Sequence, residues 1–284
     1  MKLLRVGPAG AERPALLAAD GTLRDLSGLT QDIDGAFLSG GALDELRADD
    51  ARTAALPPID PAPERVGPPV ARPGKVVCLG LNYRDHAAET GAEVPAEPIL
   101  FMKAPYTVVG PDDDVLIPRG SVKTDYEVEL AIVIGRPARY LDGPEQARAV
   151  IAGYAVSNDV SEREFQLERG GTWDKGKSCE TFNPLGPWLV TADEVPDPQA
   201  LALKLWVNGE LRQDGATKDM IFGVYETVAY ISRFMALEPG DVINTGTPAG
   251  VALGRPDGSF LRDGDLVELA IDGLGRQRQR LRGA

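Results

Sequence analysis

Two acid-bearing runs that have the pattern of buried strands constrain the fold of this chain most. In residues 124–135 the side chains of Glu127 and Glu129 fall on one face of a strand, because successive strand residues point to opposite sides. The five residues after Glu129 are all apolar, as in a strand covered on both faces. A second run, residues 153–160, carries Asp159 where the strand gives way to a loop. The pattern predicts buried strands with three carboxylates at their ends.

These carboxylates admit two interpretations. A Glu-x-Glu pair on a strand is often only the solvated face of an antiparallel sheet. Paired acids at the end of a buried strand would instead repel each other and require a counter-ion. Because all the donor atoms are oxygens, a hard divalent cation such as Mg²⁺, Mn²⁺ or Ca²⁺ would suit them. The strand pattern alone leaves both interpretations open.

The composition is that of a globular protein and argues against several classes of partner. The 284 residues, 43% of them hydrophobic, can form one large domain or a small domain and a medium one. A net charge of -13 argues against nucleic acid or an anionic membrane surface. The first residues lack the apolar core of a secretory signal and no stretch approaches a membrane span, so we expect a cytoplasmic protein. Cys78 and Cys179 are expected to be reduced thiols.

The chain is predicted to divide into a small amino-terminal domain and a larger one. Residues 1–70 combine short strands, a hairpin signal at Asp20-Gly21 and a helical pattern near residues 42–51. The proline-dense stretch 56–63 predicts an extended linker, and we place the boundary at residue 70. Strands dominate residues 71–284, with helices expected at residues 83–93, 145–153 and 224–234. The predicted class is a strand-rich α+β fold.

Three further segments carry candidate chemistry. His86, the one histidine, stands three residues before Glu89, so on a helix the carboxylate could orient the imidazole as a general base; such pairs are also common on helix surfaces. Lys177 lies in a glycine-punctuated loop, where a solvated lysine is the simpler interpretation. The turn at residues 245–250 offers hydroxyl and free backbone N–H groups that suit an anionic group.

Taken together and in order, these segments resemble the fumarylacetoacetate hydrolase superfamily. The resemblance covers residues 75 to about 270 and rests on Gly-Leu-Asn-Tyr (80–83) with His86, Asp-Tyr-Glu-Val-Glu-Leu (125–130), Asn-Asp-Val-Ser-Glu-Arg-Glu-Phe-Gln (158–166), Lys-Gly-Lys-Ser (175–178) and Thr-Gly-Thr-Pro-Ala-Gly (245–250). The stretch 163–171 is most similar to the branch that contains acylpyruvate hydrolases, 2,4-diketo-3-deoxy sugar acid hydrolases and 2-hydroxyhepta-2,4-diene-1,7-dioate isomerases.

The resemblance implies a β-roll catalytic domain behind the small amino-terminal α+β domain, usually as a homodimer. It implies that Glu127, Glu129 and Asp159 bind Mg²⁺ or Mn²⁺, and that His86 and Glu89 form a water-activating dyad on a segment that often acts as a lid. The remaining implied site residues stabilise developing charge or contact substrate: Lys177, Lys103, Arg163, Gln166, Gly246 and Thr247. One departure is Glu180, where many relatives have aspartate, and its extra methylene is expected to reshape the pocket wall.

The implied activity is divalent-metal-dependent hydrolysis of a 2,4-dioxo acid, of the acylpyruvate or 2,4-diketo-3-deoxy sugar acid type, to pyruvate and a carboxylic acid. In the expected reaction, His86 activates a water that attacks the distal carbonyl, Lys177 and Gln166 stabilise the oxyanion, and the metal stabilises the departing enolate. Oxaloacetate decarboxylation, isomerisation of a 2-hydroxy-dienoate or dehydration of a keto-deoxy sugar acid could use the same site. A protein that binds metal or ligand without catalysis is the other alternative. We expect a small 2-oxo acid as the partner.

Overall fold

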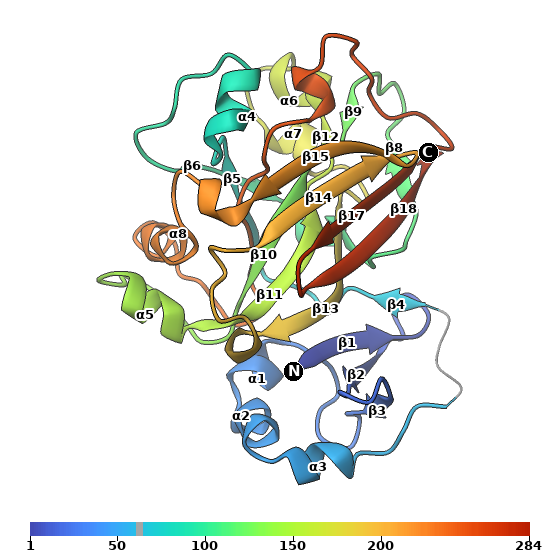
Figure 1. The fold of residues 1–284 in the computed structure, drawn as a ribbon, viewed down its shortest axis with the longest axis vertical. Coiled ribbons are helices and arrows are strands. Elements are labelled where there is room, and N and C mark those ends of the chain that lie inside the picture. The colour runs from blue at the N-terminus through green and yellow to red at the C-terminus, as the bar shows by residue number, and fades with distance from the viewer. Residues whose placement is uncertain (61–64) are drawn as a thin grey trace.

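One mixed sheet connects most strands of the chain. The computed structural model describes residues 1–60 and 65–284, and Figure 1 shows its ribbon. Within these residues the largest sheet has eleven strands. In spatial order they are β3 (Leu23–Asp25), β2 (Arg13–Leu17), β1 (Lys2–Val6), β13 (Asn183–Thr191), β11 (Ile151–Asn158), β10 (Val128–Ile134), β16 (Val242–Asn244), β5 (Val76–Gly80) and β6 (Ile99–Lys103), with β4 (Val66–Gly67) on β1 and β7 (Val108–Val109) on β13.

A second sheet covers one face of the central strands. Its strands are β15 (Glu210–Ala216), β14 (Ala202–Val207), β17 (Leu266–Ile271), β18 (Gly275–Gly283) and β8 (Val115–Ile117). In Figure 1, β14, β17 and β18 cross in front of β10, β11 and β13, and apolar side chains from both sheets form one core. Leu203, Leu205 and Val207 are buried at every second position, as expected where one face of a sheet meets the core. This β-roll confirms the predicted strand-rich α+β class.

The acid-bearing strands are β10 and β11, and they are buried as predicted. Every residue of β10 is buried, because β11 and β16 flank it and other elements cover both of its faces. The run 124–135 is not one strand, however. Residues 124–125 form β9 (Thr124–Asp125), which pairs with β12 (Ser161–Glu162), and the chain then changes partners before β10 begins at Val128. The break leaves Glu127 between two strands.

Short helices lie at the ends of the sheets. They are α4 (Arg84–Glu89), α5 (Pro144–Ala149), α6 (Arg163–Leu167), α7 (Asp174–Lys177) and α8 (Val224–Ile231), with 3₁₀ turns at Pro105–Thr107, Ala192–Glu194, Thr217–Asp219 and Ala252–Gly254. The helices predicted at 83–93 and 224–234 are confirmed with shorter bounds. The helix predicted at 145–153 ends at Ala149, since Ile151 already begins β11. In the described part of the chain, no helix combines the length and apolar character needed to cross a membrane.

The amino-terminal segment is joined to the central sheet. Its helices are α1 (Gly35–Ser39), α2 (Gly41–Ala48) and α3 (Asp50–Ala54). The hairpin predicted at Asp20-Gly21 is confirmed, because β2 and β3 pair around it with Leu17 opposite Leu23. β1 pairs with β13, with Leu3 opposite Leu189. Residues 61–64 of the predicted proline-rich linker lie outside the described residues, and the domain boundary at residue 70 stays a prediction.

Candidate metal and catalytic site

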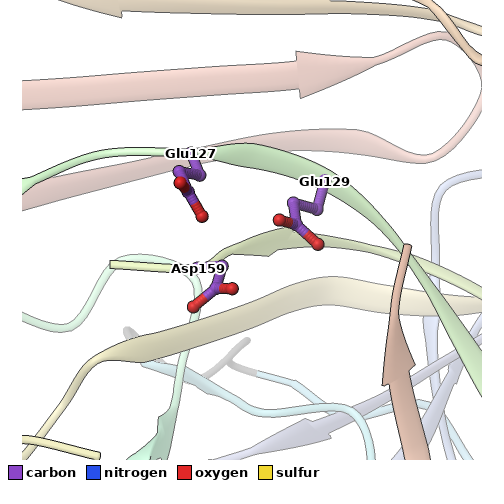
Figure 2. Close-up of side chains that lie close together, drawn as sticks. All are labelled: Glu127, Glu129 and Asp159. Atoms are coloured by element: carbon purple, nitrogen blue, oxygen red, sulfur yellow. The ribbon is translucent and has the colours of Figure 1, made fainter. Parts of the chain in front are cut away.

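The three acids indicated by the strand pattern meet in one buried cluster. One carboxylate oxygen from each of Glu127, Glu129 and Asp159 lies within 4.8 Å of the other two. Figure 2 shows the three side chains close together on neighbouring stretches of chain. All three side chains are buried. The interpretation of the Glu-x-Glu pair as a solvated strand face is therefore wrong for this protein.

Antiparallel pairing is what brings these acids together. The start of β10 lies beside the end of β11, with Val128 opposite Asn158. The Asp159 N–H donates to the Glu127 carbonyl oxygen at 3.0 Å, so the ladder continues one residue beyond both strands. Alternation along β10 then turns Glu127 and Glu129 to the same side.

Two buried lysines are bound to the acid cluster. Lys177 Nζ donates to Glu127 Oε2 at 2.7 Å and to Asp159 Oδ2 at 2.9 Å. Lys103 Nζ donates to Asp159 and, at 2.9 Å, to the Val160 carbonyl oxygen. Burial lowers the pKa of Lys177, but the charges of Asp159 and Glu127 outweigh burial and hold that pKa above its ordinary value. Lys177 is therefore a fixed ammonium group, not the solvated lysine that is common in loops.

Arg163 links Glu127 to the helix α6. Its Nη2 donates to Glu127 Oε1 at 2.6 Å, its Nε to Asp125 Oδ2 at 2.8 Å and its Nη1 to Gln166 Oε1 at 3.1 Å. Burial raises the pKa of Glu127, but Lys177 and Arg163 outweigh burial and hold it well below its usual range. Glu127 is thus an ionised carboxylate with a donor on each oxygen.

Asp125 belongs to the site, although it was not among the site residues expected from the sequence. Its carboxylate accepts the backbone N–H groups of Ala252 at 2.8 Å and Leu253 at 3.0 Å, besides the Arg163 bond. It therefore connects the acid cluster to the 3₁₀ turn at Ala252–Gly254. The signal was its spacing of two residues from Glu127, the same alternation that aligned Glu127 with Glu129.

Glu129 differs from the other acids of the cluster. Among the described residues, no lysine or arginine forms an ion pair with it, and its Oε2 accepts the Gly246 N–H at 2.8 Å. Burial, and then the charges of Asp159 and Glu127, raise the pKa of Glu129 well above its ordinary value. Without a further cation, its ionised form is therefore disfavoured.

The charge balance and the donor atoms of the cluster fit a divalent cation. Three buried cations, Lys103, Arg163 and Lys177, pair with the buried acids Asp125, Glu127 and Asp159. The fourth buried acid, Glu129, has no cation among the described residues, so with all four acids ionised one negative charge is left over. Carboxylate oxygens are the ligands that Mg²⁺ and Mn²⁺ prefer. Glu127, Glu129 and Asp159 are the residues able to hold such an ion. Its charge would oppose the burial and the repulsion that together raise the pKa of Glu129.

His86 and Glu89 form the pair that their spacing predicts. His86 Nδ1 lies 2.8 Å from Glu89 Oε1 on α4. The Glu89 carboxylate also accepts the Gly250 N–H, at 2.9 Å and 3.1 Å from its two oxygens, so it is held from a second segment. His86 is only 6% exposed and borders the same cavity as Glu127. A surface helix pair is therefore excluded.

Backbone N–H groups of the turn at residues 245–250 donate hydrogen bonds to the protein's own carboxylates. The prediction of a free N–H at Gly246 for an external anion is wrong, because that N–H donates to Glu129. Gly246 has a φ of 91°, and a Cβ there would lie 2.8 Å from Asn82 Cβ, so only glycine fits. Thr247 Oγ1 donates to the Val128 carbonyl oxygen at 2.9 Å, and Thr247 borders the cavity as expected for a substrate contact.

Lys177 lies on a helical turn, not in the loop that the glycines predicted. It ends α7, which packs on α6. A Cβ at Gly176 would lie 2.6 Å from the backbone nitrogen of Gln166 and would also meet the Glu162 carbonyl oxygen. Glycine at 176 therefore permits the close approach that places Lys177 beside the acids.

A cavity of about 220 Å³ adjoins this group of residues, and part of the group lines it. Its polar lining consists of His86, Glu127, Glu129, Arg163, Gln166, Lys177, Thr90 and Thr247. Lys103 and Gly246, predicted as substrate contacts, do not border it, and instead hold Asp159 and Glu129 in place. The structure thus brings the candidate metal ligands, the dyad and Lys177 to one site.

Glu180 is not part of this site. Its side chain is exposed and does not border the cavity, so the expectation that it reshapes the pocket wall is wrong. Its half-buried neighbour Cys179 and the buried Cys78 are both free, as predicted. Burial raises the pKa of Cys179 to about 11, which makes it a poor nucleophile near neutral pH.

Fold and site together define an α+β enzyme with a buried three-carboxylate centre. Residues 75–282 match the family described as fumarylacetoacetate (FAA) hydrolase C-terminal. The chain belongs to this family, which confirms the resemblance of the motifs.

Proteins of known structure or curated sequence extend this result over the full chain. A protein of Burkholderia ambifaria that carries only the general name of a hydrolase is 54% identical over 100% of both chains. Maleylpyruvate hydrolase from Sphingobium sp. SYK-6, solved with manganese (II) ion and pyruvate, is 30% identical with a TM-score of 0.80 over 100% of both chains. A 5-carboxymethyl-2-hydroxymuconate delta-isomerase from Mycobacterium smegmatis is 31% identical with a TM-score of 0.78, over 100% of this chain and 99% of that one.

Proposed function

We propose that this protein is a divalent-metal-dependent hydrolase that cleaves the C3–C4 bond of a 2,4-dioxo acid to give pyruvate and a carboxylic acid. The observation that carries the proposal is the His86–Glu89 pair, whose His86 borders the same cavity as Glu127 and Glu129. A general base beside a centre that can orient a 2-oxo acid is what hydrolysis requires. The manganese and pyruvate in the structure of the maleylpyruvate hydrolase relative support the metal and the 2-oxo acid.

His86 is the proposed base. Its Nδ1 faces Glu89, so Nε2 is the nitrogen left to take a proton from water. Glu89 holds the ring orientation and stabilises the imidazolium that forms. The water oxygen bonds to C4, the C3–C4 bond breaks, and C3 takes a proton. Overall, R–CO–CH₂–CO–COO⁻ and H₂O give R–COO⁻, CH₃–CO–COO⁻ and H⁺.

Lys177 is the proposed donor to the developing oxyanion. An ammonium group has three N–H donors, and Glu127 and Asp159 accept two of them. The third is available to a substrate oxygen, and Gln166 borders the same cavity. Such a preorganised donor contributes about 3 kcal/mol to transition-state stabilisation. A bound Mg²⁺ or Mn²⁺ would supply Lewis-acid stabilisation of negative charge on the 2-keto oxygen.

Isomerisation of a 2-hydroxy-dienoate is the second candidate function, because a delta-isomerase of the same fold is similar to this chain over its whole length. Isomerisation moves a proton between carbons and needs no attacking water. The dyad therefore favours hydrolysis. The proposed assembly is a homodimer, as the family resemblance implies.

A substrate panel decides among these candidates. The protein is stripped with chelator, reloaded with Mg²⁺ or Mn²⁺, and given acylpyruvates, oxaloacetate, 2,4-diketo-3-deoxy sugar acids and a 2-hydroxy-dienoate. Hydrolysis predicts metal-dependent loss of acylpyruvate absorbance with one pyruvate formed per substrate. Metal binding with no turnover of any 2-oxo acid would instead establish the binding-only alternative.

His86→Ala tests the base directly. We expect kcat on an acylpyruvate to fall by about 10²–10⁴-fold, the usual contribution of a general base, with Mn²⁺ affinity unchanged. Calorimetric titration with Mn²⁺ checks the second part. Near wild-type turnover by His86→Ala would refute the assignment.

A further inference from the structure

The cavity has a second half that the proposed chemistry does not use. Beside the ionised groups, part of its lining is apolar and comes from several separate elements. The residues that matter here are Phe101 on β6, Leu167 at the end of α6, Trp173 before α7 and Leu253 in the 3₁₀ turn at Ala252–Gly254.

Two aromatic side chains, Phe101 and Trp173, line this apolar part of the cavity. The rings of Phe101 and Trp173 lie 5.4 Å apart between centroids, tilted by 60°. Trp173 also lies over Gly80, where a Cβ would be 2.5 Å from its Cζ3 atom. Lys177 Nζ lies 4.9 Å from the centre of the Phe101 ring, so the apolar side chains lie directly beside the ionised groups. The indole is therefore fixed in place next to the reacting centre.

Two leucines lie at the opening of the cavity. Leu167 is 46% exposed and Leu253 is 37% exposed, although both border the cavity. An apolar ligand group that reached them would cover this surface, and about 25 cal/mol is gained for each Å² of apolar area removed from water. The opening thus favours an apolar group over a charged or hydroxylated one.

The cations of the lining are paired with carboxylates, and the one remaining N–H of Lys177 is assigned to the oxyanion in the proposed reaction. Among the described residues that border the cavity, the permanently charged cations are Arg163 and Lys177, and each is held by two buried carboxylates. With all four acids ionised, the cluster carries one excess negative charge. A bound divalent cation and the carboxylate of one 2-oxo acid would together bring the net charge of the site to zero. A second substrate carboxylate would enter this space without a cation to meet it, which is strongly unfavourable.

We propose that the distal group of the substrate is an uncharged, apolar acyl chain that lies against Phe101, Trp173, Leu167 and Leu253. This deepens the proposed function and rests on it: the substrate is a monocarboxylic acylpyruvate, and the second product is an aliphatic or aromatic monocarboxylic acid. The cavity of about 220 Å³ is smaller than the roughly 300–1,000 Å³ of sites for drug-sized ligands, so the acyl chain is short. Diacids and polyhydroxylated sugar acids are poor substrates.

The test compares two acids of equal shape and different charge. Succinylpyruvate ends in a carboxylate, and 7-methyl-2,4-dioxooctanoate has an isopropyl group in the same place. With Mn²⁺-loaded protein we expect kcat/KM to be at least tenfold higher for the neutral acid. Equal values, or a preference for succinylpyruvate, would overturn the proposal.

Binding of uncleavable analogues separates this proposal from the proposed hydrolysis. The acids 7-methyl-2-oxooctanoate and 2-oxoheptanedioate lack the 4-keto group, so neither can be hydrolysed. Calorimetry should show at least tenfold tighter binding of the neutral analogue, even if no acylpyruvate is turned over. Tighter binding of the diacid overturns the apolar assignment whether or not hydrolysis occurs.

Leu167→Arg places a cation at the opening of the cavity. Relative to the wild type, we expect the preference to shift at least tenfold toward succinylpyruvate. The matched control is Leu211→Arg, because Leu211 is also 46% exposed and does not border the cavity. The control should keep the wild-type preference. An unchanged preference in a folded Leu167→Arg protein, checked by thermal unfolding, contradicts the position assigned to the acyl chain.

Discussion

At the scale of single residues, Glu129 marks the candidate metal site more sharply than its neighbours do. Glu127 and Asp159 each accept two donors from lysine or arginine, whereas Glu129 has the backbone N–H of Gly246 as its donor. A carboxylate buried in this way is stable as an anion only beside further positive charge. A cation bound by the three acids would therefore stabilise the ionised form of Glu129.

Glu129→Gln tests this account. We expect Mn²⁺ affinity to fall by more than about tenfold, because even changes outside the ligand shell cost 10–100-fold in other metal sites. The metal-free variant should be at least as stable as the wild type, because glutamine replaces a side chain whose ionised form is already disfavoured without a cation. Calorimetric titration and thermal unfolding without metal measure the two effects. Glu145→Gln, on an exposed acid of α5, should change neither.

At the scale of elements, the contact between α6 and α7 sets the position of Lys177. Gly176→Ala would force the two helices apart, because its Cβ would lie 2.6 Å from the Gln166 backbone nitrogen. We expect kcat to fall by at least about tenfold as the Lys177 donor moves, with the melting temperature also lowered. Gly28→Ala is the control, since nothing lies within 4 Å of a Cβ there. Full activity of a folded Gly176→Ala protein would show that this packing does not position Lys177.

The hairpin of β1 and β2 supplies a prediction about pH. Glu12 lies 2.8 Å from Arg65 Nη1 and 3.3 Å from Arg5 Nη2. Burial raises the pKa of Glu12, but the hydrogen bond from Arg65, helped by Arg5, outweighs burial and holds the pKa below its ordinary value. A lowered folded-state pKa means that the stabilisation is complete above the unfolded-state pKa and is lost as pH falls through the folded-state value.

Glu12→Gln should therefore destabilise the protein at pH 7 by about 1.5 kcal/mol, a typical value for a charged hydrogen bond. The difference from the wild type should begin to shrink as the pH falls below about 4, where Glu12 of the unfolded chain takes up a proton, and should vanish once the pH passes the lower folded-state pKa. Urea unfolding at several pH values measures it. A difference that stays constant with pH would show that Glu12 acts through packing.

At the scale of the whole molecule, the amino-terminal segment shares a sheet and a core with the rest. Leu3 and Leu16 belong to the same apolar cluster as Val133, Ala152 and Leu189. The β1–β13 ladder crosses the predicted boundary at residue 70. We therefore predict that residues 1–70 and the rest of the chain unfold together in one transition.

Leu3→Ala tests this cooperativity. Leu3 is fully buried, so its truncation should cost about 2–5 kcal/mol. Calorimetry should show one transition, shifted as a whole to lower temperature. Two resolved transitions, with only one of them shifted, would mean that residues 1–70 unfold independently.

The sequence by itself determined the acid-bearing strands, the His86–Glu89 pair and the family, because these depend on spacing over a few residues. Strand alternation placed Glu127 with Glu129, and helical periodicity placed His86 with Glu89. It did not predict the break of the strand at Glu127 or the helical turn that carries Lys177. The break depends on β12, a partner distant in the chain from β9, and the helical turn depends on its packing against the preceding helix α6.

Only the tertiary structure decided which charges are neutralised and which surface a substrate meets. Pairing of β10 with β11 brought Asp159 to the two glutamates, and cations from three segments surrounded all acids but Glu129. The N–H groups predicted to be free at Gly246 and Gly250 were taken by Glu129 and Glu89. The electrostatic balance and the shape of the site depend on all side chains that are close in space. Spacing along the sequence predicts only contacts between residues that are close in the chain.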